Sequence, residues 1–504
     1  MPTATNNHLY DLIHSLTKSE KRYFKMSMAH NEQLTQLFDL IKTKKNLSED
    51  DILSKILPNQ KRGNIAVIKN RLYNHILKTL NQFHSEKSIE KQVKDKIQNI
   101  ELLYEKGLFD QCSKIIKSAK KIALSNDLHH TFLQISKWEK KIAVQFNYEN
   151  VDLKVIDEIC DADTASLEKI KSYHVIWDVK SKVLLKLYGK GKARSEEDIL
   201  HYIDIIKKLP SKKQMSLDLE GEYLHNHTMS AYYFCVLDPK KSYALMKKNH
   251  ELVRSNKEYF SSEPNIMLSI LTNAIYLSRK LKKDKETDKY LVELELLYAK
   301  QYDGKELQMR IFADRCLVNL ASHIMRTEYD DGLKFIPEIE QGLSQFEDEI
   351  NSTKLAGIYY SLGLIYFGVG DHSKALFWIN KILNEVRINE AEDQYCYAKI
   401  LHMIIHVELS NDDYIIHALK SLKRYLSTRK RLDEFENAFI DLISKVVKTR
   451  KEAYRKVLYE GYADEMKSLK TNPFSQSAFE YFDFEAWARN KSQEEAYPKY
   501  RNGS

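Results

Sequence analysis

The chain has 504 residues, of which 79 are Lys or Arg and 71 are Asp or Glu, so its formal net charge is +8. It contains only 14 glycines and 8 prolines, about a third of the usual share of these turn-forming residues. Sandwiches, barrels and propellers need many tight turns, so this composition excludes them. With 43% hydrophobic and 30% charged residues, the chain is expected to fold as long helices with short connectors.

The sequence predicts a cytoplasmic protein with no membrane-spanning segment. The first residues are polar and show no signal-peptide pattern. The longest nearly charge-free stretch lies between Lys354 and Asp371 and is shorter than the roughly 20 residues that a spanning helix needs. None of the five cysteines forms a CxxC pair, so all five are expected to be core residues in a reducing compartment. They are Cys112, Cys160, Cys235, Cys316 and Cys396.

Residues 1–88 are predicted to form a basic helical module. Apolar residues at three- and four-residue spacing predict short helices, the last two over 31–45 and 48–57, and then a long helix over 64–84. That helix is expected to run on to Ile97. Thr17 to Glu20 has the pattern of a capping box, and Ser48 followed by acids marks another helix start. The module holds 14 Lys or Arg and 8 Asp or Glu, most of the excess positive charge.

The long helix of this module carries basic and amide side chains on one face. No acid occurs between Ile52 and Ser85. One hypothesis is that this helix enters a DNA major groove while neighbouring cations contact phosphates, in an order of helices that faintly resembles a helix-turn-helix. The alternative is a solvated face, because the excess charge is modest and the linker before the helix is long. The candidate nucleic-acid contacts are Lys61, Arg62, Lys69, Arg71, Asn74, His75 and Lys78.

From residue 92 to 470 the pattern predicts an array of helix pairs. The clearest pair spans Lys354–Arg387, where bulky and small residues alternate as two packed antiparallel helices require. Its key positions are Tyr359, Leu362, Gly363, Tyr366, Gly370, Ala375, Ile379 and Ile382. A second match contains Ile100, Leu103, Gly107, Phe109, Cys112, Ile116 and Ala119.

The clearest pair resembles a tetratricopeptide repeat (TPR). Gly363 and Ala375 meet the small-residue positions of that family, and Tyr359 and Tyr366 meet two aromatic positions. The chain departs from the family at Ile382, where a small residue is usual, and at Arg387, where proline is usual. The resemblance implies an all-α fold, a right-handed α-α superhelix whose concave groove binds extended peptides or partner helices.

Further pairs are indicated only by register. Five positions that would begin the packing face of second helices lie about 43 residues apart: Ala244, Lys289, Gly332, Ala375 and Ala418. Among the prolines, only Pro337 falls where a helix interior is expected. Residues 471–504 are predicted to contain one amphipathic helix that caps the array, followed by a polar tail. The aromatic residues of that helix are Phe479, Tyr481, Phe482, Phe484 and Trp487.

Candidate binding residues follow from the TPR geometry. Tyr360, Leu364 and Phe367 would project from the first helix of the clearest pair and form an apolar groove floor, although aromatics at such spacing are more often interhelical core. His402 and His406 have the i, i+4 spacing of a helical metal pair but lack the glutamate of a zinc hydrolase motif. We interpret them as a polar strip on the concave face, with no metal.

No catalytic motif stands out in the sequence. The run Gly189-Lys190-Gly191-Lys192 lacks the offsets of a phosphate loop and is interpreted as a flexible connector. No dinucleotide fingerprint or nucleophile elbow is found. We therefore expect no enzymatic activity and no cofactor.

Two functions remain in view from the sequence. The first is a non-catalytic adaptor whose TPR-like groove binds a protein or peptide. The second is a regulator in which the amino-terminal module binds DNA and the array senses a peptide or partner, a plan similar to that of bacterial peptide-sensing TPR regulators. The ligand and the oligomeric state are not specified by the sequence.

Overall fold

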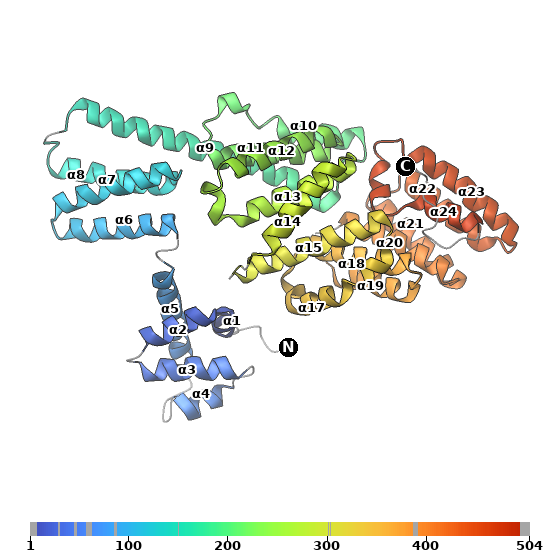
Figure 1. The fold of residues 1–504 in the computed structure, drawn as a ribbon, viewed down its shortest axis with the longest axis horizontal. Coiled ribbons are helices and arrows are strands. Elements are labelled where there is room, and N and C mark those ends of the chain that lie inside the picture. The colour runs from blue at the N-terminus through green and yellow to red at the C-terminus, as the bar shows by residue number, and fades with distance from the viewer. Residues whose placement is uncertain are drawn as a thin grey trace. The chain divides into compact units, whose positions relative to one another are not determined.

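The computed structural model describes residues 8–28, 31–44, 48–56, 63–84, 88–149, 151–300, 302, 304–386 and 392–493. Within these ranges the chain forms twenty-four α-helices and short 3-10 turns, without a strand (Figure 1). The predicted all-α class is confirmed. None of the described helices combines the length and the hydropathy that crossing a bilayer requires. The chain divides into two compact units, residues 1–171 and 172–504.

The first unit begins with five helices around one core, drawn in blue in Figure 1. They are α1 (His8–Ser15), α2 (Lys18–Ser27), α3 (Glu32–Thr43), α4 (Glu49–Ile56) and α5 (Gly63–Phe83). Helix α5 contacts each of the other four, because its apolar stripe is buried along most of its length. Both expected caps are present, since Thr17 and Glu20 form a reciprocal capping box and Ser48 pairs in the same way with Asp51.

The rest of the first unit has a separate core. Its helices are α6 (Ile89–Glu105), α7 (Phe109–Ser125), α8 (His129–Gln145) and the first half of α9 (Leu153–Lys190). Ile100, Cys112 and Ala119 of the second sequence match are fully buried here. The expected continuation of the long basic helix to Ile97 is wrong, because α5 ends at Phe83 and Ser88 is extended before α6 begins.

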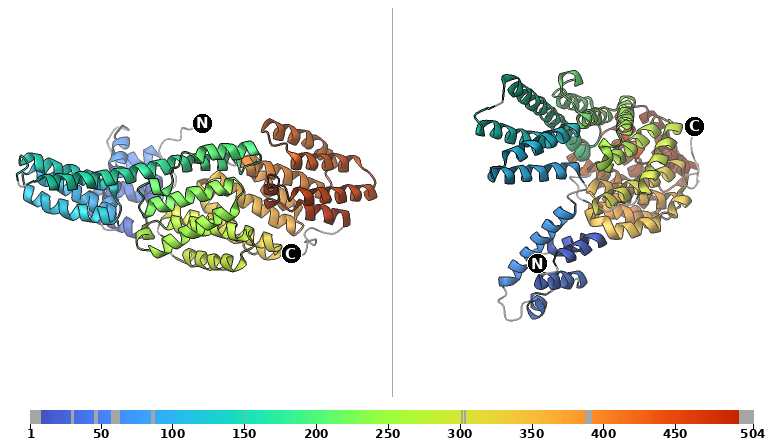
Figure 2. Two further views of the ribbon diagram at one scale, coloured as in Figure 1. Left: turned by 90° about the horizontal axis from the view of Figure 1, so that it is seen from above. Right: turned by 60° about the vertical axis from the view of Figure 1, so that its left-hand side comes forward.

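The second unit consists mainly of helix pairs that follow one another in chain order, from green through orange to red in Figures 1 and 2. After α9 come α10 (Glu196–Ile206), α11 (Leu219–Cys235), α12 (Pro239–Ser255), α13 (Pro264–Lys280), α14 (Asp284–Tyr298), α15 (Lys305–Arg326), α16 (Tyr329–Leu333), α17 (Ile336–Phe346), α18 (Ser352–Gly368), α19 (His372–Glu385), α20 (Glu392–Glu408), α21 (Asp412–Thr428), α22 (Glu434–Lys448), α23 (Glu452–Leu469) and α24 (Phe484–Gln493). From α12 to α21 the second helices begin 40 to 45 residues apart, close to the spacing expected from the sequence. One second helix is split into α16 and α17, and Pro337 lies in the first turn of α17, because proline is tolerated there and not in a helix interior.

The pair α18 and α19 shows why small residues recur in the pattern. A Cβ atom at Gly363 would lie only 2.8 Å from Cδ1 of Ile379, so the two helices approach closely at this point. Ala375, Ile379 and Ile382 are fully buried between them. The large residue at position 382, unusual for a TPR, thus fills interhelical space. Position 387 lies outside the described residues.

The predicted single capping helix at the carboxyl end is wrong in part. Residues Gln476–Glu480 form a 3-10 turn, residues 481–483 are irregular, and only then does α24 begin. Trp487 of α24 is fully buried, packs edge-on against Tyr459 of α23 and donates a hydrogen bond of 2.7 Å to Glu408. Helix α24 therefore packs against α23 and is tied to α20 through Glu408. The residues before α24 follow a different course.

The close approach at Gly363 gives a direct test of pair packing. We expect Gly363→Ala to destabilise the second unit by about 1–3 kcal/mol, because the added methyl group overpacks the site. The matched control is Gly461→Ala in α23, where an added Cβ meets no atom within 4 Å. This change should stabilise the chain by about 1 kcal/mol through helix propensity. Urea unfolding followed by circular dichroism measures both shifts, and equal shifts in the two variants would contradict the packing described.

Candidate functional site

The three residues expected to form an open groove floor are buried, and two of them lie against the chain's own carboxyl-terminal part. Tyr360, Leu364 and Phe367 of α18 are at most 9% exposed. The ring of Tyr360 lies 5.6 Å from that of Tyr481, and the ring of Phe367 lies 5.5 Å from that of Phe482. The prediction of an exposed floor is therefore wrong, because the aromatic residues that precede α24 cover it.

We call residues 475–484 the docked segment. Three consecutive side chains of this segment contact three different helices. Glu480 reaches α13, Tyr481 reaches α20 and Phe482 reaches α18. The residues of these helices that receive it, which we call the docking face, are Tyr276, Lys280, Tyr360, Phe367, Asp393 and Tyr397.

Glu480 is held by cations from two parts of the second unit. Its carboxylate lies 2.5 Å from the ammonium groups of both Lys192 and Lys280, and the Tyr276 hydroxyl donates a hydrogen bond of 2.5 Å to it. Burial opposes ionisation of this carboxyl, but the two lysines outweigh that effect and lower the pKa of Glu480 to about 2. The side chain keeps 28% of its surface exposed, so this charge lies at the solvent edge of the segment.

Tyr481 occupies the centre of the docking face. Its ring stacks on that of Tyr397 with centroids 4.0 Å apart and planes within 16°. Its hydroxyl donates a hydrogen bond of 2.7 Å to Asp393, and the ring of Tyr360 meets it edge-on. Stacked and edge-to-face aromatic contacts each contribute about 0.5–1.5 kcal/mol beyond area burial. The site is thus shaped for a phenol ring.

A loop that follows α9 supplies Lys192 and closes against helices far along the chain. Gly191 has a left-handed backbone (φ +83°), and a Cβ there would lie 2.9 Å from Asp393 Cγ. The main-chain oxygen of Lys190 accepts a hydrogen bond of 2.5 Å from Arg431. The interpretation of residues 189–192 as a flexible connector is therefore wrong, because backbone and side chains fix this loop to residues more than 200 positions away.

Two arginines, the buried Arg431 and the partly buried Arg194, hold the loop in place. The Arg194 guanidinium lies 2.5 Å from Glu436 and 2.9 Å from Asp433, both at the start of α22. The Arg431 guanidinium lies 2.5 Å from Asp393, and its side chain is only 5% exposed. Burial disfavours these charges, but the adjacent acids outweigh it and raise the pKa of both arginines. We call these five residues the ionic clasp.

His402 and His406 do not lie on the docking face. Both are buried, their rings are 4.5 Å apart, and both pack against Tyr414 of α21. His406 also pairs with Asn411 at 2.9 Å. Burial, with His406 and Lys399 nearby, lowers the pKa of His402 to about 4, so the imidazole is neutral at pH 7. The predicted polar strip on a concave face is wrong, because these rings fill space between α20 and α21.

The candidate nucleic-acid residues of α5 are divided by the structure. Arg71, Asn74 and Lys78 are exposed on one face, and neither cation forms an ion pair with any described residue. His75 is half-buried, with its ring 6.1 Å from Phe24 of α2, so its assignment to the open face is wrong. Lys69 is partly buried, while Lys61 and Arg62 lie outside the described residues.

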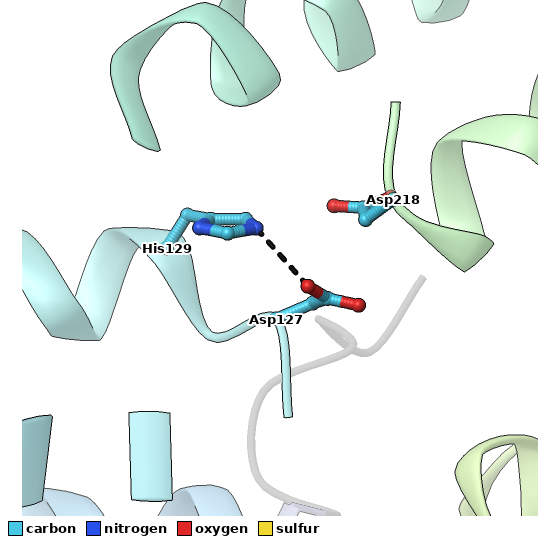
Figure 3. A group of neighbouring side chains, drawn as sticks. All are labelled: Asp127, His129 and Asp218. Atoms are coloured by element: carbon cyan, nitrogen blue, oxygen red, sulfur yellow. Dashed lines mark ion pairs between the residues drawn. The ribbon is translucent and has the colours of Figure 1, made fainter. Parts of the chain in front are cut away.

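Figure 3 draws one further group of titratable side chains, Asp127, His129 and Asp218. In the first unit, His129 lies 3.5 Å from Asp127 and 3.3 Å from Ser166, and His129 and Lys169 lower the pKa of Asp127 despite its partial burial. Asp218 belongs to the second unit, where its carboxylate caps α11. Each group thus has a structural role, and we assign no metal to them.

Comparison with known proteins adds no family to this description. The chain matches no known family, and no curated protein or solved structure is significantly similar to it.

The ionic clasp and the docked segment were not identified from the sequence as parts of one site. The aromatic run before α24 was visible, but its partners are spread over α13, α18 and α20. The sequence also shows a glycine at position 191, and a glycine is the residue type that adopts the left-handed backbone found there. The pairing of Arg194 and Arg431 with acids about 40 to 240 residues away had no sequence signal.

The close contact at Gly191 yields a second prediction. Both Gly191 and Gly370 have left-handed backbones, but a Cβ at Gly370 meets no atom within 4 Å. Replacing either by Ala costs about 1 kcal/mol for the backbone. Gly191→Ala should cost about 1–3 kcal/mol more, because Arg431 and Tyr481 fix the Asp393 carboxylate that it meets. Thermal unfolding of the two variants measures the difference, and equal melting temperatures would rule out this role for Gly191.

Proposed function

We propose that this chain is a non-catalytic, cytoplasmic scaffold with a TPR-like array that binds a short segment of a partner protein on its docking face. One observation supports this proposal above the others: the docking face already holds a short segment of the chain itself, a 3-10 turn followed by irregular residues. The contacts are made by side chains of α13, α18 and α20. In the TPR resemblance these are first helices of pairs, which would line the concave groove.

The composition of the docking face also suits a peptide ligand. It combines aromatic rings, which give contact area with little conformational freedom to lose, with a cation and a carboxylate that fix orientation. Tyr276 remains 40% exposed beside Lys280, so part of the face is open next to the docked segment. A partner chain has access at this point.

Site-specific photo-crosslinking tests the proposal. Asn273 is exposed one turn before Tyr276 on the same face of α13, and Phe377 is an exposed aromatic on α19, a second helix. A photoreactive phenylalanine at position 273 should crosslink to one short segment of one partner protein, and the same group at position 377 should not. Equal crosslinking from both positions, or none from position 273, would refute the proposal.

A second candidate function is DNA binding by the amino-terminal helices, with the array sensing a peptide or partner. The specific observation in its favour is the exposed row of Arg71, Asn74 and Lys78 on α5, whose cations have no acidic partner among the described residues. Cations of this kind are available for phosphates, and amides for base edges.

A salt titration tests this candidate. If α5 contacts DNA, binding to a random-sequence duplex should weaken steeply from about 50 to 200 mM salt, and Arg71→Ala/Lys78→Ala should lower the log-log slope by about 2. The matched control, Lys114→Ala/Lys117→Ala on exposed positions of α7, removes the same charge and should leave the slope unchanged. Salt-insensitive binding, or equal effects of both variants, excludes this function.

A further inference from the structure

We propose that the docking face recognises a partner peptide in which an acidic residue is followed by two aromatic residues, and that the chain's own Glu480-Tyr481-Phe482 competes with that peptide for the same site. This inference rests on the proposed function and goes further, because it names the ligand chemistry and a form of self-regulation.

The first position of the motif is defined by charge. Lys192 and Lys280 come from different parts of the second unit and converge on one carboxylate, with the Tyr276 hydroxyl donating to it as well. Without an acid between them, the two ammonium groups would repel each other. Charge-assisted hydrogen bonds of this kind are about twice as strong as neutral ones. The face therefore selects an acidic side chain at this position.

The second position is defined by ring stacking and one hydrogen bond. Tyr397 provides a parallel surface, Tyr360 an edge-on contact, and Asp393 accepts the phenol proton. The Asp393 carboxylate is itself fixed by Arg431 of the ionic clasp. A residue without a hydroxyl would leave this acceptor without its donor, which favours Tyr over Phe here.

The third position is an apolar contact. Phe482 is only 4% exposed and packs edge-on against Phe367 of α18. Its ring also contacts Phe484 at the start of α24. Burial of an aromatic side chain is favourable because it removes a large apolar surface from water. Together the three positions recognise one short sequence, an acidic residue followed by two aromatic residues.

The manner of docking explains why a separate peptide can replace the segment. Its main-chain hydrogen bonds form local turns, such as Ala478 N–H to Ser475 O and Tyr481 N–H to Ala478 O. Its attachment to the docking face is by side chains. A peptide with the same side chains can therefore make the same contacts once it forms this local 3-10 turn, without a main-chain hydrogen bond to the docking face.

Competition follows from the tether. A segment linked to its own site by a short connector acts at an effective concentration of about millimolar. A partner peptide can therefore displace the segment only if its higher affinity offsets this effective concentration, or if the binding of the segment has first been weakened. Glu480 lies at the partly exposed edge of the segment, so replacement would begin at the acidic position.

A peptide-binding experiment on the full-length chain tests the inference. The probe is a fluorescent peptide with the sequence of residues 475–484, and anisotropy gives its affinity. Tyr481→Ala/Phe482→Ala weakens the tethered segment and should raise affinity for the probe at least tenfold over wild type. Adding Lys192→Glu/Lys280→Glu should remove that gain, and a probe carrying Glu480→Lys should restore it.

A second variant covers the case in which the double alanine change unfolds the chain. Glu480→Lys alters one partly exposed residue, and it too should bind the unmodified probe more tightly than wild type. If a folded variant, judged by helical circular dichroism, does not bind the probe, the segment is a structural staple and the inference is wrong. Dimers formed by segment exchange would also overturn it, because a second copy would then be the occupant.

The two proposals fail in different ways. Crosslinking from position 273 to a partner segment that lacks an acid followed by two aromatics would leave the scaffold function standing and refute the motif. Probe binding without any partner crosslink would support the motif and refute the scaffold.

Discussion

The architecture of the second unit depends on the ionic clasp, in which the buried Arg431, the partly buried Arg194 and three acids tie the loop after α9 to α20 and α22. Taking charges out of water costs free energy. The attraction within a buried ion pair offsets this cost only when its geometry is good and its remaining hydrogen bonds are made. Both arginines meet this condition, since Arg194 contacts two acids and Arg431 also donates to a main-chain oxygen. Removing one partner of such a set costs about 3–5 kcal/mol, because a charge stays buried without its counterion.

The clasp also positions the docking face. Asp393 lies between Arg431 and the hydroxyl of Tyr481, so the same carboxylate that fixes the loop also orients the segment. Gly191 allows the backbone to approach this carboxylate, and Lys192, the next residue, contacts Glu480. Loop, helices and segment therefore form one connected set of contacts. A substitution at any of these residues is therefore expected to weaken the contacts made by the others.

The sequence predicted what is local and missed what is distant. The all-α class follows from the scarcity of Gly and Pro. The caps at Thr17 and Ser48 and the pairing of α18 with α19 follow from patterns within fewer than 40 residues, and the structure contains these features. Whether Tyr360 and Phe367 are exposed depends on residues more than 100 positions later in the chain, Tyr481 and Phe482. Helical periodicity marks a buried stripe but not what covers it, which explains why an occupied surface was predicted as an open one.

Amide hydrogen exchange on the intact chain tests most directly whether the clasp holds loop, helices and segment together. In an Arg194→Met variant, the account predicts that residues 475–484 and the first turns of α20 and α22 lose protection together, by about tenfold or more. The helices α6 to α8 of the first unit should exchange as in the wild type. Loss of protection confined to residues 190–194, with the docked segment as protected as before, would contradict the account.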